Sequence, residues 1–455
     1  MYGTAIIKEN KKAVASSSLL MIFTIAALGI VIYFGNLLTI NTSKITDLIC
    51  LVSFPFLPVS SIVSSICFLI PLHSGITGLY VYGYAVLMLL IKTKTFKIKA
   101  ILPMIVIVLY EMAMMLLAGS QQIMHIVVYA LAIFLLLYIM NTEEANPEEA
   151  CFSYICGTLV LLISIFTTAI QNNSLEMILT GTVRIGSYEG IEEIGQVAVV
   201  TENANAMAYY ALVAIMIAFG LIKNASFRGK IFLLFSMLIS TFIALFTVSR
   251  TFAVALVVML ALASMTNYNL TQRLKVFIII FVILFLTVPF LLRETEIYDA
   301  FLARFEEDDL TSDTGRSKIF KDYMDFLWNN PLRMIFGTGA VFYREVCNLK
   351  RSMHNGTQQI LVSYGLLGFI PMLSVLFSPV TDYFKKNKFK LAKLIPLISV
   401  IAFVQTIQFL NPNNLMLPFA IAILYMKIPD KESNQCIQKS YKSSPPSAQA
   451  VPRRW

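Results

Sequence analysis

Apolar runs of about 20 residues follow one another along most of the chain, and short polar segments separate them. A helix of this length spans the roughly 30 Å hydrocarbon core of a bilayer, whereas the short alternating segments of an outer-membrane barrel are not seen. From residue 100 onward the runs are clear: 100–118, 121–140, 151–170, 205–222, 230–248, 252–266, 275–292, 356–379, 394–410 and 412–427. The pattern predicts an all-α, polytopic integral membrane protein.

The first hundred residues are less regular. An apolar run from Ala13 to Leu38 follows a short basic segment, exceeds a signal-peptide core in length and lacks a clear cleavage site, so we expect a retained first span. Residues 44–91 form a long apolar stretch that three prolines interrupt. Either two or four spans fit before Lys92, which predicts about 12 to 14 transmembrane helices in total.

Composition supports the membrane assignment. The mean hydropathy is +0.75, 58% of residues are hydrophobic and 13% are charged, whereas soluble chains keep about a quarter of their residues charged. The six cysteines show no paired spacing, and no phosphate-binding glycine motif is present, so we expect no disulfide framework, no metal site, no cofactor and no nucleotide-driven pump. Nucleic acid is not an expected partner.

Basic residues indicate the orientation of the spans. Of the 35 Lys and Arg residues, 23 fall in six segments: the N-terminus, 92–99, 223–230, 267–275, 381–393 and the tail from Lys427. By the positive-inside rule these segments face the cytoplasm. The remaining polar segments, 171–204, Ser249-Arg250, 293–355 and Asn411, are then extracytoplasmic, and parity alone places the acidic 141–150 loop in the cytoplasm. We expect one membrane domain, 1–427, and a disordered basic tail, 428–455.

The polar stretch 293–355 holds most of the groups capable of chemistry. Within it, apolar positions recur on one helical face opposite charged ones, which predicts a helix on the membrane surface; these positions are Ile319, Phe320, Tyr323, Met324 and Leu327. Asn330-Pro331 ends this helix, and Gly337-Thr338-Gly339 predicts a flexible turn. The chain returns to the bilayer at about Asn355, which puts His354 at the outer interface.

His354 is the strongest candidate for acid–base chemistry. An imidazole with a pKa near 6.5 can accept a proton from a hydroxyl group, although position alone fits an exposed interfacial histidine equally well. The other two histidines, His73 and His125, lie near or within apolar runs, where a hydrogen-bonded structural role is favoured. Of the three histidines, His354 is therefore the one that we consider as a catalytic base.

Three extracytoplasmic arginines could bind an anion. Arg250 lies in a very short turn between two apolar runs, where a charge is costly without a partner. A lipid diphosphate is a suitable partner, because the planar guanidinium fork bonds phosphate oxygens at two points; snorkelling to lipid headgroups is the alternative. Arg184 and Arg316 are placed similarly. Stretch 293–355 carries 9 basic and 11 acidic residues, however, so most of its charges are expected to be solvated.

Two groups of carboxylates need an interpretation. The acidic run Glu306-Glu307-Asp308-Asp309 lacks the ligand spacing and the glycine of a calcium loop, which favours a solvated turn. Glu111 is an intramembrane carboxylate and thus a functional candidate, facing a polar cavity or pairing with His125 on the neighbouring span. Its role stays open at this point.

Several short motifs occur in a fixed order between residues 180 and 380. They are Arg184-Ile185-Gly186, Asn203-Ala204-Asn205 opening a span, Ser249-Arg250, and the stretch from Gly315-Arg316 to Gly368. In order and topology they resemble the O-antigen polymerase and ligase family. The chain departs from it at Ala204, where relatives often show proline, and at Ser352-Met353 before His354. These departures concern local loop shape more than chemistry.

The resemblance implies a glycosyltransferase of the membrane-embedded GT-C type at the outer face of the bacterial inner membrane. The donor would be an oligosaccharide on undecaprenyl diphosphate, and no metal would be needed. His354 and Arg250 would be catalytic, whereas Arg184, Arg316 and Asn355 would bind the diphosphate and the glycan. Besides membrane lipids and a glycan acceptor, the resemblance implies a chain-length regulator and a flippase as partners.

Three functions fit these observations. The first is an O-antigen or capsule polymerase, which joins one lipid-linked repeat unit to the end of another. The second is an O-antigen ligase, which uses the same donor and lipid A core as acceptor. A flippase for lipid-linked sugars is the third, but it would place basic residues along a central cavity rather than at one face.

Overall fold

The computed structural model describes residues 2–38, 40–72, 79–94, 97–121, 123–172, 185–186, 204–267, 315–349, 351–410 and 416–429. Helices make up all of the regular structure in this part of the chain. Seven of them are long and apolar enough to cross a bilayer, and five shorter apolar helices accompany them. The predicted all-α, polytopic membrane protein is confirmed.

The helices of the first half are α1 (Tyr2–Leu37), α2 (Ser43–Ser53), α3 (Val59–Leu69), α4 (Leu79–Lys92), α5 (Ile98–Ala118), α6 (Ile123–Asn141), α7 (Pro147–Asn172), α10 (Ala204–Leu221), α11 (Phe227–Leu245) and α12 (Arg250–Asn267). Those of the second half are α15 (Arg316–Asn329), α16 (Pro331–Phe336), α17 (Tyr343–Cys347), α18 (Gly356–Lys386), α19 (Leu391–Val404) and α20 (Leu417–Met426).

From residue 100 onward, nine of the ten predicted runs coincide with helices, and the tenth, 275–292, lies outside the described residues. The choice between 12 and 14 spans therefore stays open. The largest differences from the predicted boundaries are in α18, which continues to Lys386 rather than ending at 379, and in α19, which ends at Val404 rather than at 410. Residues 405–410 leave the helix since the backbone N–H groups of Phe409 and Leu410 donate to the Gln359 side chain instead.

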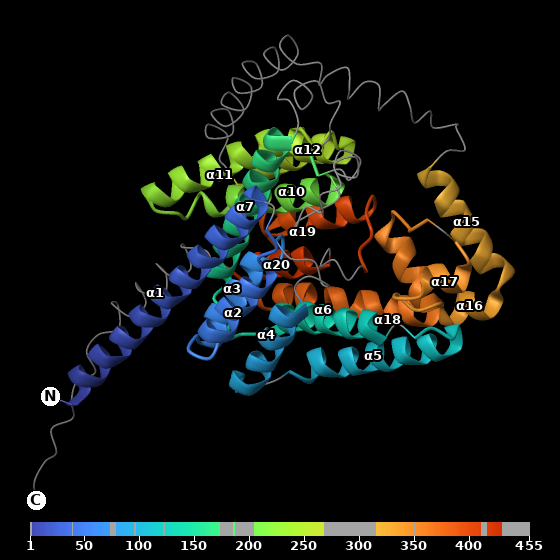
Figure 1. The fold of residues 1–455 in the computed structure, drawn as a ribbon, viewed down its shortest axis with the longest axis horizontal. Coiled ribbons are helices and arrows are strands. Elements are labelled where there is room, and N and C mark those ends of the chain that lie inside the picture. The colour runs from blue at the N-terminus through green and yellow to red at the C-terminus, as the bar shows by residue number, and fades with distance from the viewer. Residues whose placement is uncertain are drawn as a thin grey trace, which may run out of the picture.

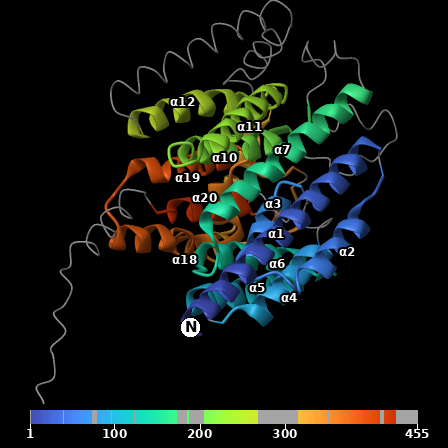
Figure 2. The ribbon, with the colours of Figure 1, turned by 90° about the vertical axis from the view of Figure 1, so that its left-hand side faces the viewer.

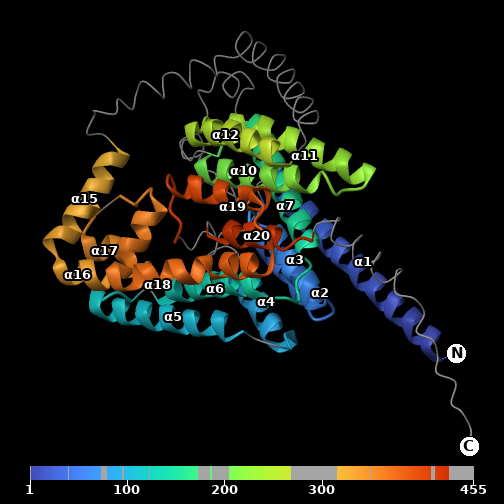
Figure 3. The ribbon, with the colours of Figure 1, turned by 180° about the vertical axis from the view of Figure 1, so that it is seen from behind.

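The helices form layers (Figure 1). Helices α10, α11 and α12 lie on one side, α6, α18 and α5 lie on the other, and α19 and α20 run between them; the view from behind shows the same order (Figure 3). Seen from the side, α1, α2 and α7 cover one flank of these layers (Figure 2). The short helices α15, α16 and α17 gather at one end, beside the beginning of α18.

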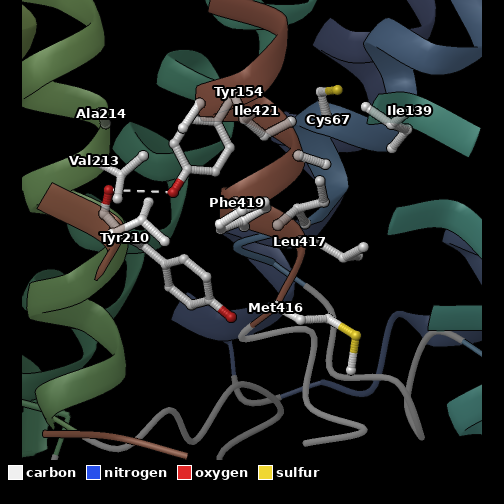
Figure 4. Packing of buried hydrophobic residues seen from close by; sticks show 14 of the residues in the cluster. Cys67, Ile139, Tyr154, Tyr210, Val213, Ala214, Met416, Leu417, Phe419 and Ile421 are labelled. Atoms are coloured by element: carbon white, nitrogen blue, oxygen red, sulfur yellow. Dashed lines mark hydrogen bonds between the residues drawn. The ribbon is translucent and has the colours of Figure 1, made fainter. Parts of the chain in front are cut away.

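Burial separates the central helices from those that face lipid. Helix α10 is buried along most of its length, and Tyr154 of α7 donates a hydrogen bond to the Tyr210 carbonyl at 3.3 Å in the core that also holds Phe419 of α20 (Figure 4). Helix α5 instead exposes large apolar side chains such as Leu109 and Leu116. An exposed apolar face of this kind is typical of a helix that contacts lipid, which agrees with a membrane-embedded α5.

Several predicted cytoplasmic segments meet at one end of the structure. Lys97 forms an ion pair with Glu143 of the acidic loop at 2.7 Å, and the Lys427 amine donates to the carbonyl of Met140 at 2.6 Å. Lys92 and Lys393 likewise donate to backbone carbonyls near the ends of α2 and α20. Lysines thus satisfy carbonyls that helix ends leave open. The 141–150 loop lies with the basic segments, as parity predicts.

Some predicted features cannot be compared with the structure. His73, Arg184, the run Glu306–Asp309 and almost all of the tail 428–455 lie outside the described residues. The division into a membrane domain and a disordered tail therefore remains a prediction.

Candidate active site at the beginning of helix α18

Helix α15 begins at Arg316 and is amphipathic, as the sequence predicts. Its buried face consists of Ile319, Tyr323 and Leu327, which pack in a small hydrophobic cluster with Tyr343, Cys347, Met353 and Val362. Phe320, which was expected on the same face, is 46% exposed. Asn330-Pro331 ends the helix as predicted, since proline cannot continue its hydrogen bonding and instead opens α16.

Two hydrogen bonds tie α15 to the segment around His354. The Tyr323 hydroxyl donates to the carbonyl of Arg351 at 2.8 Å, and the Gln358 amide donates to the carbonyl of Phe320 at 2.7 Å. Both Tyr323 and Gln358 are buried, so each bond is made where an unpaired polar group would be costly. Helix α15 therefore has a fixed position relative to the beginning of α18.

The beginning of α18 is itself tightly held. Asn355 caps the helix, because its side-chain oxygen accepts the backbone N–H of Gln358 at 2.9 Å. A Cβ atom on Gly356 would lie 2.6 Å from the Cβ of Phe409, so only glycine fits there. The Gln359 oxygen accepts the N–H groups of Phe409 and Leu410, both at 2.8 Å. His354 thus precedes a helix whose first turn is fixed on three sides.

In the structure Arg316 lies near enough to His354 for its guanidinium to act electrostatically on the imidazole, although 37 residues separate the two in the sequence. His354 is half-buried, and loss of hydration together with the nearby Arg316 guanidinium lowers the pKa of the imidazole from its usual 6.5. A lowered pKa keeps the imidazole neutral near pH 7. His354 is therefore able to accept a proton, with a cationic side chain close by.

Arg250 is the first residue of α12 and follows a strained turn. Val248 has a φ angle of 47°, which is rare for a β-branched residue and costs about 1–2 kcal/mol. The turn is held by the N–H of Ile185, which donates to the Phe246 carbonyl at 3.1 Å. This bond places Ile185-Gly186, the described part of the Arg184-Ile185-Gly186 motif, directly beside the turn. The Ser249 hydroxyl is buried and has no partner among the described residues.

The Arg250 turn and the Arg316–His354 pair lie at the same end of the helices. Tyr209, near the beginning of α10, packs its ring against Phe403 near the end of α19, with centroids 5.4 Å apart. Helix α11 runs back from α10, so its last residue and the Arg250 turn return to this end. Beyond Phe403, the backbone of residues 409 and 410 bonds to Gln359. The end of α19 therefore connects both groups of predicted site residues.

The segment between α16 and α17 was missed as a docked element. We predicted a flexible turn at Gly337-Thr338-Gly339, but residues 337–340 are buried, and the N–H groups of Thr338 and Gly339 donate to carbonyls of α18 at 2.8–3.1 Å. The carbonyls are free because α18 kinks at Gly365, where φ is +62°. Glycines at 337, 339 and 365 were the only available signal in the sequence.

Glu111 contacts this docked segment rather than His125. Its carboxylate accepts the backbone N–H of Ala340 at 2.7 Å and that of Val341 at 3.2 Å. The Nδ1 atom of His125 is buried and has no hydrogen-bond partner among the described residues. The suggested Glu111–His125 pairing is therefore wrong. Among all the residues that the structure describes, no group of three or more His, Cys, Asp and Glu side chains could hold a metal ion.

A family comparison covers most of these residues. Residues 235–373 match the O-antigen ligase family model. The matched segment is 139 of the 455 residues and contains Arg250, Arg316, His354 and Asn355, whereas Arg184 lies outside it. The match confirms the resemblance to the O-antigen polymerase and ligase family, whose members are glycosyltransferase-like enzymes acting on lipid-linked glycans. No curated protein matches the chain.

Proposed function

We propose that the protein is a polysaccharide polymerase of the bacterial inner membrane, which transfers an undecaprenyl-diphosphate-linked glycan to the end of another lipid-linked repeat unit. The observation that carries the proposal is the proximity of Arg316 to a neutral His354 at the beginning of α18. A base beside a cation is what transfer from a diphosphate ester needs, since a proton is removed while negative charge develops nearby.

The reaction then proceeds in one displacement at the extracytoplasmic face. The acceptor hydroxyl oxygen attacks the anomeric carbon of the donor, and His354 takes the hydroxyl proton on an imidazole nitrogen. The bond between the anomeric carbon and the diphosphate oxygen breaks, and its electron pair leaves with the lipid diphosphate. Attack from the opposite face inverts the anomeric centre. Positioned arginines stabilise the leaving charge, so we propose that no metal is required.

Arg250 and Arg184 complete the diphosphate site in this proposal. Arg250 stands at the N-terminus of α12, where backbone N–H groups and the helix dipole also favour an anion. The buried hydroxyl of Ser249 could donate to the same anion. The bond between Ile185 and Phe246 supports the placement of the Arg184 motif beside this turn. Asn355 would contact the glycan with the part of its amide that the helix cap leaves free.

A ligase is the second candidate, because the matching family model is described as O-antigen ligase. A ligase would use the same donor, and His354 and the arginines would have the same roles. The two activities differ only in the acceptor, which is a lipid-linked glycan for the polymerase and lipid A core for the ligase. The acceptor therefore has to be determined by experiment.

The deciding experiment measures product length with purified protein and a synthetic undecaprenyl diphosphate repeat unit, without added metal. The wild type should form a ladder, and His354→Ala should lower turnover by about 10²- to 10⁴-fold, as expected when a general base is removed. His125→Ala is the matched control and should keep the ladder. Donor binding should be retained in both variants.

Three results would contradict parts of this proposal. A full ladder from His354→Ala would show that His354 is not the base. Product only after addition of lipid A core would identify a ligase. Movement of the donor across a vesicle membrane without any transfer would favour the flippase, which should tolerate His354→Ala.

A further inference from the structure

The segment 336–341 reaches the outer half of helix α5, inside the apolar region of the protein. Glu111 belongs to the candidate span Ile101–Ala118 and is fully buried. Both of its carboxylate oxygens are occupied, Oε1 by the N–H of Ala340 at 2.7 Å and Oε2 by the N–H of Val341 at 3.2 Å. A carboxyl group in this environment is costly and is retained only where it has a specific partner. Here the partner is the backbone of the extracytoplasmic segment.

Two tyrosines extend this contact. The Tyr364 hydroxyl contacts the Glu111 carboxylate and lies 2.6 Å from the Tyr129 hydroxyl. When Tyr129 donates to Tyr364 and Tyr364 donates to Glu111, every hydroxyl proton has an acceptor. Glu111 then accepts three hydrogen bonds and donates none. A glutamine at this position could keep one of the two backbone bonds, because its amide nitrogen would face an N–H donor at the other.

Shape complementarity holds the same segment at its other side. The Tyr110 hydroxyl bonds to the carbonyls of Phe336 and Ser363 at 2.7 and 2.9 Å. A Cβ atom on Gly337 would lie 2.6 Å from the backbone nitrogen of Gly365, and a Cβ on Gly339 would lie 3.1 Å from Oε2 of Glu111. The backbone of the segment therefore packs directly on the kink of α18 and on Glu111.

A short path leads from Glu111 to the candidate active site. Val341 lies two residues before α17, which contributes Tyr343 to the cluster beneath α15. That cluster also contains Met353, the residue before His354. The carbonyls that receive the N–H groups of Thr338 and Gly339 belong to the first, separate part of α18, which begins just after Asn355. Displacement of 337–341 would thus move both elements that place Arg316 and His354.

We propose that Glu111 is a positioning residue for glycan transfer, because its carboxylate fixes residues 340 and 341 and thereby the geometry of Arg316 and His354. The inference rests on the proposed function. Glu111 does not touch the reacting atoms, so its loss should lower turnover while the donor still binds at Arg250. A displacement of about 1 Å in a catalytic group can cost about 100-fold in rate.

The test compares Glu111→Gln and Glu111→Leu with the exposed Glu148→Gln as a control. We expect kcat to fall about 10-fold for Glu111→Gln, which can keep one backbone bond, and about 100-fold or more for Glu111→Leu. The donor Kd should change less than threefold, and Glu148→Gln should match the wild type. Activity is expressed per folded protein, measured by size-exclusion chromatography of each variant.

A second readout follows the segment itself. Cys347 is 7% exposed in the cluster beneath α15, so its labelling by a maleimide reports whether the cluster opens. Labelling should be faster in Glu111→Leu than in Glu111→Gln and wild type. A kcat of Glu111→Leu equal to that of the wild type would overturn the inference. So would an equal fall of kcat in both Glu111 variants that is accompanied by an equal weakening of donor binding. If the wild type transfers the glycan to neither acceptor, the proposed function is overturned. The labelling rate of Cys347 would in that case still show whether Glu111 holds residues 340 and 341 in place.

Discussion

Replacement of Gly365 by alanine tests whether the segment 336–341 is docked on the kink of α18. Gly365 has a φ angle of +62°, and a Cβ atom there would lie 2.6 Å from the backbone nitrogen of Gly337 and still nearer to the Ile335 carbonyl oxygen. Both neighbours are backbone atoms, which cannot rotate away. Gly365→Ala should therefore push α16 away from α18.

The magnitude follows from two contributions. A left-handed φ costs an alanine about 1–2 kcal/mol, and an overpacked contact that forces a backbone shift costs about 1–3 kcal/mol. Together they amount to about 2–5 kcal/mol. If this free energy is lost from the docked state, the population of the open state rises by a factor of about 30 or more, since each 1.4 kcal/mol is tenfold.

The labelling rate of Cys347 by a maleimide measures this opening. When opening and closing are fast relative to labelling, the rate is proportional to the open population. A Cys436→Ser background removes the thiol of the predicted tail. Gly83→Ala is the matched control, because Gly83 lies inside α4 and its nearest neighbour to an added Cβ is a Leu131 methyl at 3.8 Å.

We expect Gly365→Ala to label at least about 30-fold faster than Gly83→Ala. A difference below threefold would refute the docked arrangement of α16 and the kink. Faster labelling in both variants would instead indicate general loosening of the fold rather than release of this contact.

Two further predictions concern the candidate active site. Because neutral His354 is the proposed base and its pKa is lowered, kcat/KM should fall only as pH drops below 6.5. The Arg316→Gln variant removes one cause of the lowered pKa, so the pH at which kcat/KM falls to half should move to a higher value. If that pH is unchanged or lower in the variant, the proximity of the two side chains is contradicted. The Gln359→Leu variant leaves the N–H groups of Phe409 and Leu410 and the carbonyl of Leu410 without their partner. The free energy of unfolding, measured by thermal unfolding in detergent, should therefore fall by about 3 kcal/mol or more. An equal fall in the exposed Gln405→Leu variant would refute this assignment.

Much of the architecture could be predicted because it depends on local sequence. The length of each apolar run sets where a helix can cross a bilayer, and the spacing of Ile319, Tyr323 and Leu327 identified the buried face of α15. Asn330-Pro331 ends α15 for a reason contained in two residues. His354 and Arg316 could be proposed from residue type, order and resemblance.

Contacts between distant residues could not be predicted in this way. Arg316 lies beside His354 because α15 is fixed by Tyr323 and Gln358, and α19 ends early because Gln359 binds the backbone of residues 409 and 410. Each of these hydrogen bonds joins residues 28 to 50 positions apart, and no local pattern specifies such a pair.

The sequence by itself determined that this chain is a helical membrane protein with one long polar stretch, since the bilayer selects apolar helices by length and composition alone. Only the tertiary structure decided what Glu111 does. Its partners, Ala340 and Val341, are backbone N–H groups more than 220 residues away, and every residue except proline carries such a group. Side-chain identity therefore gives no signal for this contact, and only the packing of α5 against the kink of α18 defines it.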